Sequence, residues 1–139
     1  IVACMTFSRS RLNKNYKYEL LRFCSKNYHH VVGGASRLLK KFRDNYIGSI
    51  ISYADKRYSD GGLYKKLGFT LVSESVPGCS FVNIKNGTVH SRHGFKKYEL
   101  VGTEGIDLGN TEDPKVYEIV QLNGYDRIWD VGMYGFVME

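Results

Sequence analysis

The residues best suited to chemistry lie in one loop, between a buried strand and a short helix. The strand is expected at residues 49–54, and the helix begins at Gly61-Gly62 and ends at Gly68 as its C-cap. The charged and hydroxyl residues of the loop are Asp55, Lys56, Arg57, Ser59 and Asp60. Ligand sites of open α/β sheets occupy this position, at the carboxyl end of a strand, so we expect a site here.

The two carboxylates of this loop have different expected roles. Asp55 ends the strand beside two cations, where it either acts as a base, holds a metal ion or anchors the loop through a salt bridge. Asp60 precedes Gly61 and Gly62, at the expected start of the helix, and we expect it to cap that helix.

The Gly33-Gly34 turn is a second candidate, because an amphipathic helix running to about Asn45 is expected directly after it. Free backbone N–H groups and the helix dipole favour an anion at such a turn, and glycine lets a phosphate approach the backbone closely. The alternative is a loop that uses the glycines only for tight geometry.

The chain has 139 residues, enough for one domain with a hydrophobic core. No apolar run approaches the roughly 20 residues of a membrane span, and no signal peptide is visible. The chain begins at Ile1, inside a strand expected at 1–7, so we expect upstream sequence to be missing.

The three cysteines, Cys4, Cys24 and Cys79, include no Cys-x-x-Cys pair, which excludes a zinc ribbon. Their number and spacing favour three reduced, mostly buried thiols in a cytosolic protein.

Positive charge is concentrated in the first hundred residues. The net charge is +6, yet residues 1–100 hold 18 Lys and Arg against 6 Asp and Glu, whereas residues 101–139 hold 2 against 8. This distribution is typical of a protein that binds a polyanion such as nucleic acid, although solvated surface charge also produces it. The residues expected to contact phosphates are Arg9, Arg11, Lys14, Arg37, Lys40, Lys41, Lys56, Arg57, Arg92, Lys96 and Lys97.

The hydrophobic pattern predicts an α/β (α+β) fold with a mixed, mostly antiparallel sheet and packed helices. Further strands are expected at 16–25, 70–75, 80–85 and 88–91, the last two forming a hairpin around Asn86-Gly87. We expect one domain over 1–139: a basic core to residue 100, then an acidic loop, a helix over 115–123 and a terminal hairpin of 126–131 and 134–138. Trp129 is expected in the core.

Three further sets of residues have candidate roles. In the strand over 16–25, alternation places Arg22 on the face of Tyr18 and Leu20, where it either reaches a ligand or is simply exposed. His90 and His93 lack a third ligand, so no metal site is expected, and a phosphate-contacting segment is favoured. The eleven tyrosines interleave with basic residues, which suits stacking on bases, although core packing is the more frequent role.

The order of elements over about residues 1–75 resembles the GNAT acyltransferase fold. In that family a Gln/Arg-x-x-Gly-x-Gly/Ala loop holds the pyrophosphate of acyl-CoA; His30, Gly33 and Ala35 occupy those positions, and His30 departs from the usual residue. The ending Tyr-Lys-Lys-Leu-Gly-Phe over 64–69 also resembles the family, which implies that Tyr64 protonates the leaving thiolate. The resemblance implies an N-terminally incomplete fold and a donor site of His30, Val32, Gly33, Gly34 and Ala35.

A narrower resemblance runs nearly the length of the chain. Segments 5–7, 18–23, 32–39, 50–55 and 123–132 are similar to the C-terminal GNAT-like module of phage-encoded homing-endonuclease-like proteins. This implies DNA as a partner, the cytoplasm of a phage-infected bacterium as the location, and a nuclease domain or the first half of the GNAT fold upstream. The chain itself contains no GIY-YIG, LAGLIDADG, HNH or PD-(D/E)xK nuclease signature.

A third resemblance bears on mechanism. Residues 52–57 and 62–64 are similar to a segment of Mom-type DNA modification proteins, which are GNAT-like and alter adenine in DNA. The similarity implies that Ser52, Asp55 and Tyr64 lie in the pocket as catalytic residues.

Two functions are therefore expected, with a bare scaffold role as a third. The first is a DNA-binding module of a homing-endonuclease-like protein that contacts phosphates through a basic face. The second is an acyl or related group transferase that uses a CoA-type donor, acting on a DNA base, with Tyr64 as acid and Asp55 as base or orienter. An open gap between the second and third strands, beside Gly33, favours the transferase. A gap filled by side chains such as His30 favours the binding module.

Overall fold

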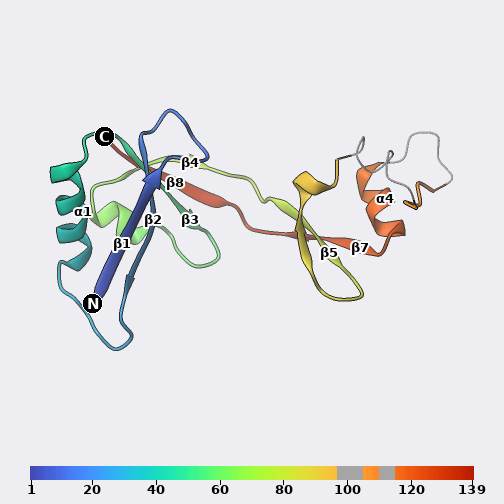
Figure 1. The fold of residues 1–139 in the computed structure, drawn as a ribbon, viewed down its shortest axis with the longest axis horizontal. Coiled ribbons are helices and arrows are strands. Elements are labelled where there is room, and N and C mark those ends of the chain that lie inside the picture. Colours follow the sequence, from blue (N-terminus) through green and yellow to red (C-terminus); the bar gives the residue numbers. More distant parts are fainter. Residues whose placement is uncertain (97–104, 110–114) are drawn as a thin grey trace. The chain divides into compact units, whose positions relative to one another are not determined.

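The computed structural model describes residues 1–96, 105–109 and 115–139, and the chain divides into two compact units. Unit 1 comprises Ile1–Val76 and Gly132–Glu139, and unit 2 comprises Pro77–Val131. The described residues form eight strands in mostly antiparallel sheets and three α-helices, which confirms the expected mixed class (Figure 1). The boundary expected at residue 100 lies outside the described residues.

Unit 1 is built on a five-stranded sheet. Its elements are β1 (Ala3–Arg9), β2 (Tyr18–Ser25), α1 (Gly34–Asn45), β3 (Ile50–Asp55), α2 (Gly62–Lys66), β4 (Thr70–Glu74) and β8 (Met133–Met138). The strand order is β1-β2-β3-β8-β4. β2 and β3 are parallel and are connected through α1, whereas the other neighbouring pairs are antiparallel (Figure 1).

Both helices of unit 1 cover the same face of the sheet. Leu39 of α1 belongs to one hydrophobic cluster with Ile50 and Phe136 of the sheet, and Tyr64 and Leu67, in and just after α2, pack against this cluster. The apolar residues of α1 recur three or four positions apart, so one stripe of the helix meets the sheet and the charged residues remain outside.

Unit 2 has its own three-stranded sheet and its own core. Its elements are β5 (Cys79–Asn83), β6 (Val89–Ser91), the 3₁₀-helix η1 (Arg92–Gly94), α4 (Val116–Leu122) and β7 (Tyr125–Trp129), with strand order β6-β5-β7. The expected hairpin of β5 and β6 is confirmed. Ile119 and Val120 of α4 are buried against Phe81. Among the described residues, no helix has both the length and the apolar character that crossing a membrane requires.

The expected terminal hairpin is wrong. β7 pairs with β5 in unit 2, whereas β8 pairs with β3 and β4 in unit 1. Four consecutive residues of β8, 135–138, are buried, as is typical of a central strand that is covered on both faces. An alternating pattern identifies a strand but does not name its partner, and these two strands, though adjacent in sequence, pair elsewhere.

Two expectations about burial are also wrong. Cys4 and Cys24 are exposed and face each other across β1 and β2, with their Sγ atoms 3.1 Å apart, and Cys79 is half-buried. Trp129 is 60% exposed. β1 and β7 are edge strands, and β2 pairs with β3 only at Tyr18 and Glu19, so Cys4, Cys24 and Trp129 each lack a neighbouring strand on one side.

Candidate functional site

The parallel ladder between β2 and β3 ends soon after it begins. It consists of two residue pairs, Tyr18 with Ile50 and Glu19 with Ile51. β2 nevertheless continues to Ser25 and β3 to Asp55. Just beyond the ladder the Ser52 Oγ donates to the Leu20 carbonyl at 2.7 Å. The strands therefore part toward their carboxyl ends, and the space between residues 20–25 and 52–55 is referred to below as the fork.

A β-bulge in β2 accompanies this parting. Phe7 of β1 lies opposite Leu20 and Thr6 lies opposite Arg22, so Leu21 is the extra residue. A bulge bends its strand and increases its twist, which carries β2 away from β3. It also inverts the alternation of side chains beyond it. Arg22 therefore lies on the opposite face from Leu20, and its expected place beside Tyr18 and Leu20 is wrong.

Backbone groups of both strands turn into the fork beyond the ladder. The Tyr18 N–H donates to the Ser49 carbonyl at 3.0 Å, so alternate residues of β3 starting from Ser49 direct their N–H and C=O toward β2. Tyr53 is the first of these beyond the ladder. On β2 the Lys26 N–H donates toward β1, so by the same alternation Phe23 directs its N–H and C=O into the fork. The fork thus has two open polar edges.

Tyr64 places its hydroxyl at one of these edges. Its ring stacks on Phe136 at a centroid distance of 5.1 Å, which fixes the side chain against the sheet. The hydroxyl donates to the Tyr53 carbonyl at 3.4 Å. Because that carbonyl faces β2, the hydroxyl lies on the fork side of β3. The hydrogen bond is long, so the hydroxyl can readily change partner.

α1 follows the carboxyl end of β2 along the chain, through residues 26–33 (Figure 1). Gly33 is the N-cap, with φ at +68°, a conformation that glycine adopts readily, and no side chain caps the helix. No described group accepts a hydrogen bond from the N–H groups of Ala35 and Ser36. His30 and Val32 are exposed, so His30 does not plug the gap.

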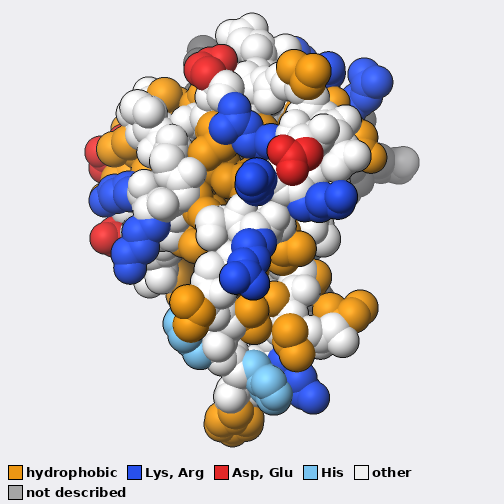
Figure 2. Space-filling model, turned by 90° about the vertical axis from the view of Figure 1, so that its left-hand side faces the viewer, with side chains coloured by type: hydrophobic (Ala, Val, Ile, Leu, Met, Phe, Trp, Pro, Cys, Tyr) orange, Lys and Arg blue, Asp and Glu red, His pale blue; other side chains and the backbone are white. Residues whose placement is uncertain are grey.

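A groove of about 480 Å³ lies between α1 and α2 on the helix-bearing face. Three cations, Lys40, Arg43 and Lys66, line it against one carboxylate, Asp44. Within the described part of the chain, Lys40 and Lys66 form no ion pair with an acidic group. Figure 2 faces α1 and shows Lys and Arg side chains gathered over this side of unit 1. The groove can therefore attract phosphate.

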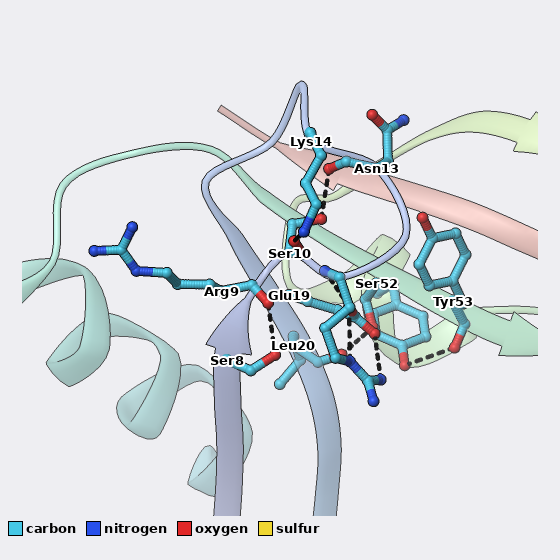
Figure 3. A network of polar contacts seen from close by, with 11 residues as sticks. Ser8, Arg9, Ser10, Asn13, Lys14, Glu19, Leu20, Ser52 and Tyr53 are labelled. Carbon is cyan, nitrogen blue, oxygen red and sulfur yellow. Dashed lines mark hydrogen bonds and ion pairs between the residues drawn. The ribbon is translucent and has the colours of Figure 1, made fainter.

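The opposite face carries a buried carboxylate at the end of the ladder. Glu19 is 4% exposed and accepts hydrogen bonds from Arg11, at 2.9 Å from Nη2, 3.4 Å from Nε and 3.2 Å from the backbone N–H (Figure 3). The Arg11 side chain lowers the pKa of Glu19, and burial opposes this shift. Glu19 therefore remains ionised at neutral pH, held by the 10–17 loop.

Glu19 also lines a cavity of about 540 Å³ on this face. Arg22, Tyr53 and Met133 contribute to the same cavity. Burial raises the pKa of Tyr53, and the charge of Glu19 adds to the effect. Arg22 is exposed and has no ion-pair partner among the residues described. The cavity thus offers a carboxylate, a phenol and a guanidinium to a ligand that reaches the fork from this side.

Glu19 was missed by sequence reasoning. The available signal was a single acid between Tyr18 and Leu20, in a strand that is otherwise apolar at that point. A charged residue there is buried only if it is paired, and its partner Arg11 belongs to a loop whose course the sequence does not reveal.

The structure brings the predicted catalytic residues to different environments. Ser52 is fully buried, and its hydroxyl is engaged with Leu20. Asp55 accepts hydrogen bonds from the Arg57 side chain, the shortest at 2.6 Å from Nη2, and this contact lowers the pKa of Asp55. A carboxylate with a lowered pKa is a weak base, which favours the anchoring role. Tyr64 alone of the three presents its functional group to the fork.

Asp60 is not the N-cap of α2, so the cap expected of it is wrong, but its carboxylate does contact the start of the helix. Its Oδ1 accepts a hydrogen bond from the Gly62 N–H at 2.9 Å, and Gly61 is the N-cap residue itself. The carboxylate thereby satisfies a helix donor and is engaged structurally.

The predicted phosphate-contacting residues are divided between exposed and engaged side chains. Four are held by other groups: Arg11 by Glu19, Lys14 by the Ser10 carbonyl, Lys56 by Glu74 and Arg57 by Asp55. Arg9 is exposed on β1, and α1 exposes Arg37, Lys40 and Lys41 with no acidic partner in the described regions. Arg92 and Lys96 lie in unit 2, and Lys97 lies outside the described residues. No group of three or more His, Cys, Asp or Glu that could hold a metal occurs among the residues described.

No protein-family model matches this sequence, and the curated proteins give no match either. The function must therefore be inferred from the fork, its edges and the charges around it.

Proposed function

We propose that unit 1 is a group-transferase domain that binds a CoA-type donor in the fork between β2 and β3. The observation that carries this proposal is the parting of two parallel strands after two residue pairs, which leaves backbone groups of Phe23 and Tyr53 facing an open gap. The arm of such a donor is extended and carries amide groups. An extended polar chain can pair with open strand edges in the way an added strand does.

The start of α1 and the groove beside it suit the phosphate end of the donor. The uncapped N–H groups of Ala35 and Ser36 and the positive end of the helix dipole favour an anion. Lys40 and Lys66 add positive charge from the two helices that border the groove. On this proposal the phosphates of the donor lie on this helix-bearing face of unit 1, and its arm is directed into the gap.

The groups at the fork can then serve an acyl transfer. An acceptor amine attacks the thioester carbon, so that a C–N bond forms, the C–S bond breaks, water takes the proton from nitrogen, and the thiolate takes a proton from the Tyr64 hydroxyl. The ionised Glu19 accepts a hydrogen bond from the amine and orients it, from the face opposite the helices. Asp55, held by Arg57, anchors the loop.

A thermal shift experiment tests the proposal. Acetyl-CoA is expected to raise the unfolding temperature progressively with concentration, because a ligand that binds only the folded state stabilises it by mass action. Duplex DNA is titrated in parallel. The double variant Lys40→Gln/Lys66→Gln should need more acetyl-CoA for the same shift, and Lys17→Gln, a lysine of the same unit outside the groove, should behave like the wild type. A flat response to acetyl-CoA would refute the donor site.

A second function, DNA binding through the outer face of α1, is favoured by one observation. Arg37, Lys40 and Lys41 are exposed there without acidic partners among the described residues, on the side of unit 1 shown in Figure 2. Phosphate contacts of this kind would make binding to duplex DNA weaken steeply with salt. A shift with DNA but none with acetyl-CoA would support this function over the transferase.

A further inference from the structure

We infer that unit 2 contains a binding site for single-stranded nucleic acid, in a cavity between α4 and the sheet. This inference goes beyond the proposed function and does not depend on it. The cavity has a volume of about 400 Å³ and is bordered by β5, β7, α4 and the segment that begins with η1. The residues that matter for the argument are Arg92, His93, Lys96, Tyr117, Arg127 and Trp129.

Aromatic surface is the first property of this cavity. The register pairs Cys79 with Trp129 and Phe81 with Arg127, so the Trp129 and Arg127 side chains emerge on one face of the sheet. Trp129 is 60% exposed, which is unusual for the largest apolar side chain. The Arg127 guanidinium carbon lies 3.6 Å from the centroid of the Tyr117 ring and 5.7 Å from that of Trp129. The cavity thus presents flat π surfaces beside a fixed, planar cation.

Charge is the second property of this cavity, and its sign is opposite to the net charge of unit 2. Residues 77–131 hold 6 Lys and Arg against 8 Asp and Glu, so the unit as a whole is acidic. The cavity lining nevertheless includes Arg92, Lys96 and Arg127, together with His93, and the described lining has no carboxylate. Three of the six Lys and Arg of this acidic unit therefore line one cavity, which indicates an anionic ligand.

Together the aromatic surface and the positive charge of the cavity favour a ligand that has a planar ring and a phosphate group. Successive bases of a single strand stack on aromatic side chains, while Arg and Lys follow the phosphates. A base inside a duplex has no free face to offer, so an unstacked strand fits better than a double helix. An acidic peptide would use the cations, but the flat face of the Trp129 ring is matched best by the π face of a base.

The chain offers a direct reporter for this site, because Trp129 is its one tryptophan. Adding a short oligothymidylate to the full chain should quench the tryptophan fluorescence saturably, since stacking places a base on the indole. Binding is measured separately by the anisotropy of a labelled oligonucleotide. If the oligonucleotide binds while the fluorescence stays unchanged, the site lies elsewhere and the inference fails. Thymidine monophosphate binding as tightly as the oligonucleotide would also overturn it in favour of a mononucleotide pocket.

Substitutions in the cavity are compared with the wild type by the same anisotropy measurement of oligonucleotide binding. Arg127→Gln and Trp129→Ala should each weaken oligonucleotide binding at least about fivefold, the loss expected for one stacking contact. Trp129→Phe keeps an aromatic face and should retain most of the affinity, which distinguishes stacking from a general loss of structure. Lys85→Gln, an exposed lysine of the β5–β6 turn outside the cavity lining, should bind like the wild type. Equal affinity of Arg127→Gln and the wild type would contradict the inference, whatever the outcome with acetyl-CoA.

Discussion

At the scale of single residues, each proposed role depends on what already engages the side chain. The hydroxyl of Ser52 and the carboxylate of Asp55 are engaged by Leu20 and Arg57, so they support the fork and its loop. The Tyr64 hydroxyl has one long hydrogen bond at the edge of the fork. Glu19 is buried with a charged partner, which keeps it ionised. Glu19, although paired with Arg11, lines the cavity at the fork, which Asp55 does not. The Tyr64 hydroxyl and the Glu19 carboxylate are therefore the two groups that the proposed transfer uses.

Replacing Tyr64 tests its role as the acid. Tyr64→Phe keeps the ring that stacks on Phe136 and removes only the hydroxyl, so acetyl-CoA should bind within about twofold of the wild type. Release of free thiol from acetyl-CoA in the presence of single-stranded DNA should slow roughly 100-fold, the usual effect of losing a positioned proton donor. Tyr134→Phe, a half-buried tyrosine of β8, is the matched control. An unchanged rate in Tyr64→Phe would exclude this role.

The Arg11–Glu19 pair gives a prediction about pH. The pKa of Glu19 is lowered in the folded state, so its contribution to stability is present above the unfolded pKa, about 4.3, and is lost as pH falls through the folded value. Arg11→Gln should lower the free energy of unfolding at pH 7, and only modestly, because Arg11 is itself exposed. The difference from wild type should shrink by pH 3.

Urea unfolding at both pH values measures this effect. Arg22→Gln, an exposed arginine with no ion pair in the described part of the chain, serves as the control and should change stability little at either pH. A loss in Arg11→Gln of the same size at pH 3 and pH 7 would show that the pair does not act through the charge of Glu19.

At the scale of elements, sequence pattern identified most of the helices and strands but not how the strands pair. The apolar stripe of α1, the buried run of β3 and the Asn86-Gly87 turn are local signals, and the structure places these elements where they were expected. The bulge at Leu21 depends on β1, and the interior position of β8 depends on strands over 50 residues away in sequence. The fork results from such non-local pairing, so no local pattern could predict it.

The loop before α2 depends on a glycine that nothing else can replace. At Gly61, φ is +79° and a Cβ would overlap the Phe136 ring, whereas at Gly87, with φ at +71°, a Cβ would meet no atom. Gly87→Ala should cost about 1 kcal/mol for the left-handed backbone alone. Gly61→Ala should cost roughly a further 1–3 kcal/mol from overpacking. Thermal unfolding of both variants checks the difference, and equal losses would contradict the described contact.

Cross-linking can test the register of β1 and β2. Because the Sγ atoms of Cys4 and Cys24 lie 3.1 Å apart and are exposed, oxidised glutathione should convert the two thiols into one intramolecular disulfide, releasing reduced glutathione. The product should lose the mass of two hydrogens and give a single cross-linked peptide on mass spectrometry. Cys79 should stay outside this link. Failure of Cys4 and Cys24 to form this link would contradict the register.

At the scale of the whole molecule, the two units differ in net charge. Residues 1–76 and 132–139 hold 14 Lys and Arg against 6 Asp and Glu, whereas unit 2 is acidic apart from its cavity. Dividing the sequence at residue 100 did not separate the charges of the two units. Unit 2 has basic residues before position 100, and β8 of unit 1 follows it in the sequence. Unit 1 thus has the overall charge to attract a phosphate-bearing donor, and unit 2 has a local site for a strand.

The most direct test of the fork as a donor site is a titration of the ¹⁵N-labelled chain with acetyl-CoA, followed by amide NMR. The amides of Phe23 and Tyr53, which face the gap, and those of Ala35 and Ser36, at the start of α1, should show the largest shifts. Ile51, paired in the ladder, and Val89, in unit 2, should move little. Saturable acetyl-CoA binding that leaves the Phe23 and Tyr53 amides unmoved would contradict the central claim.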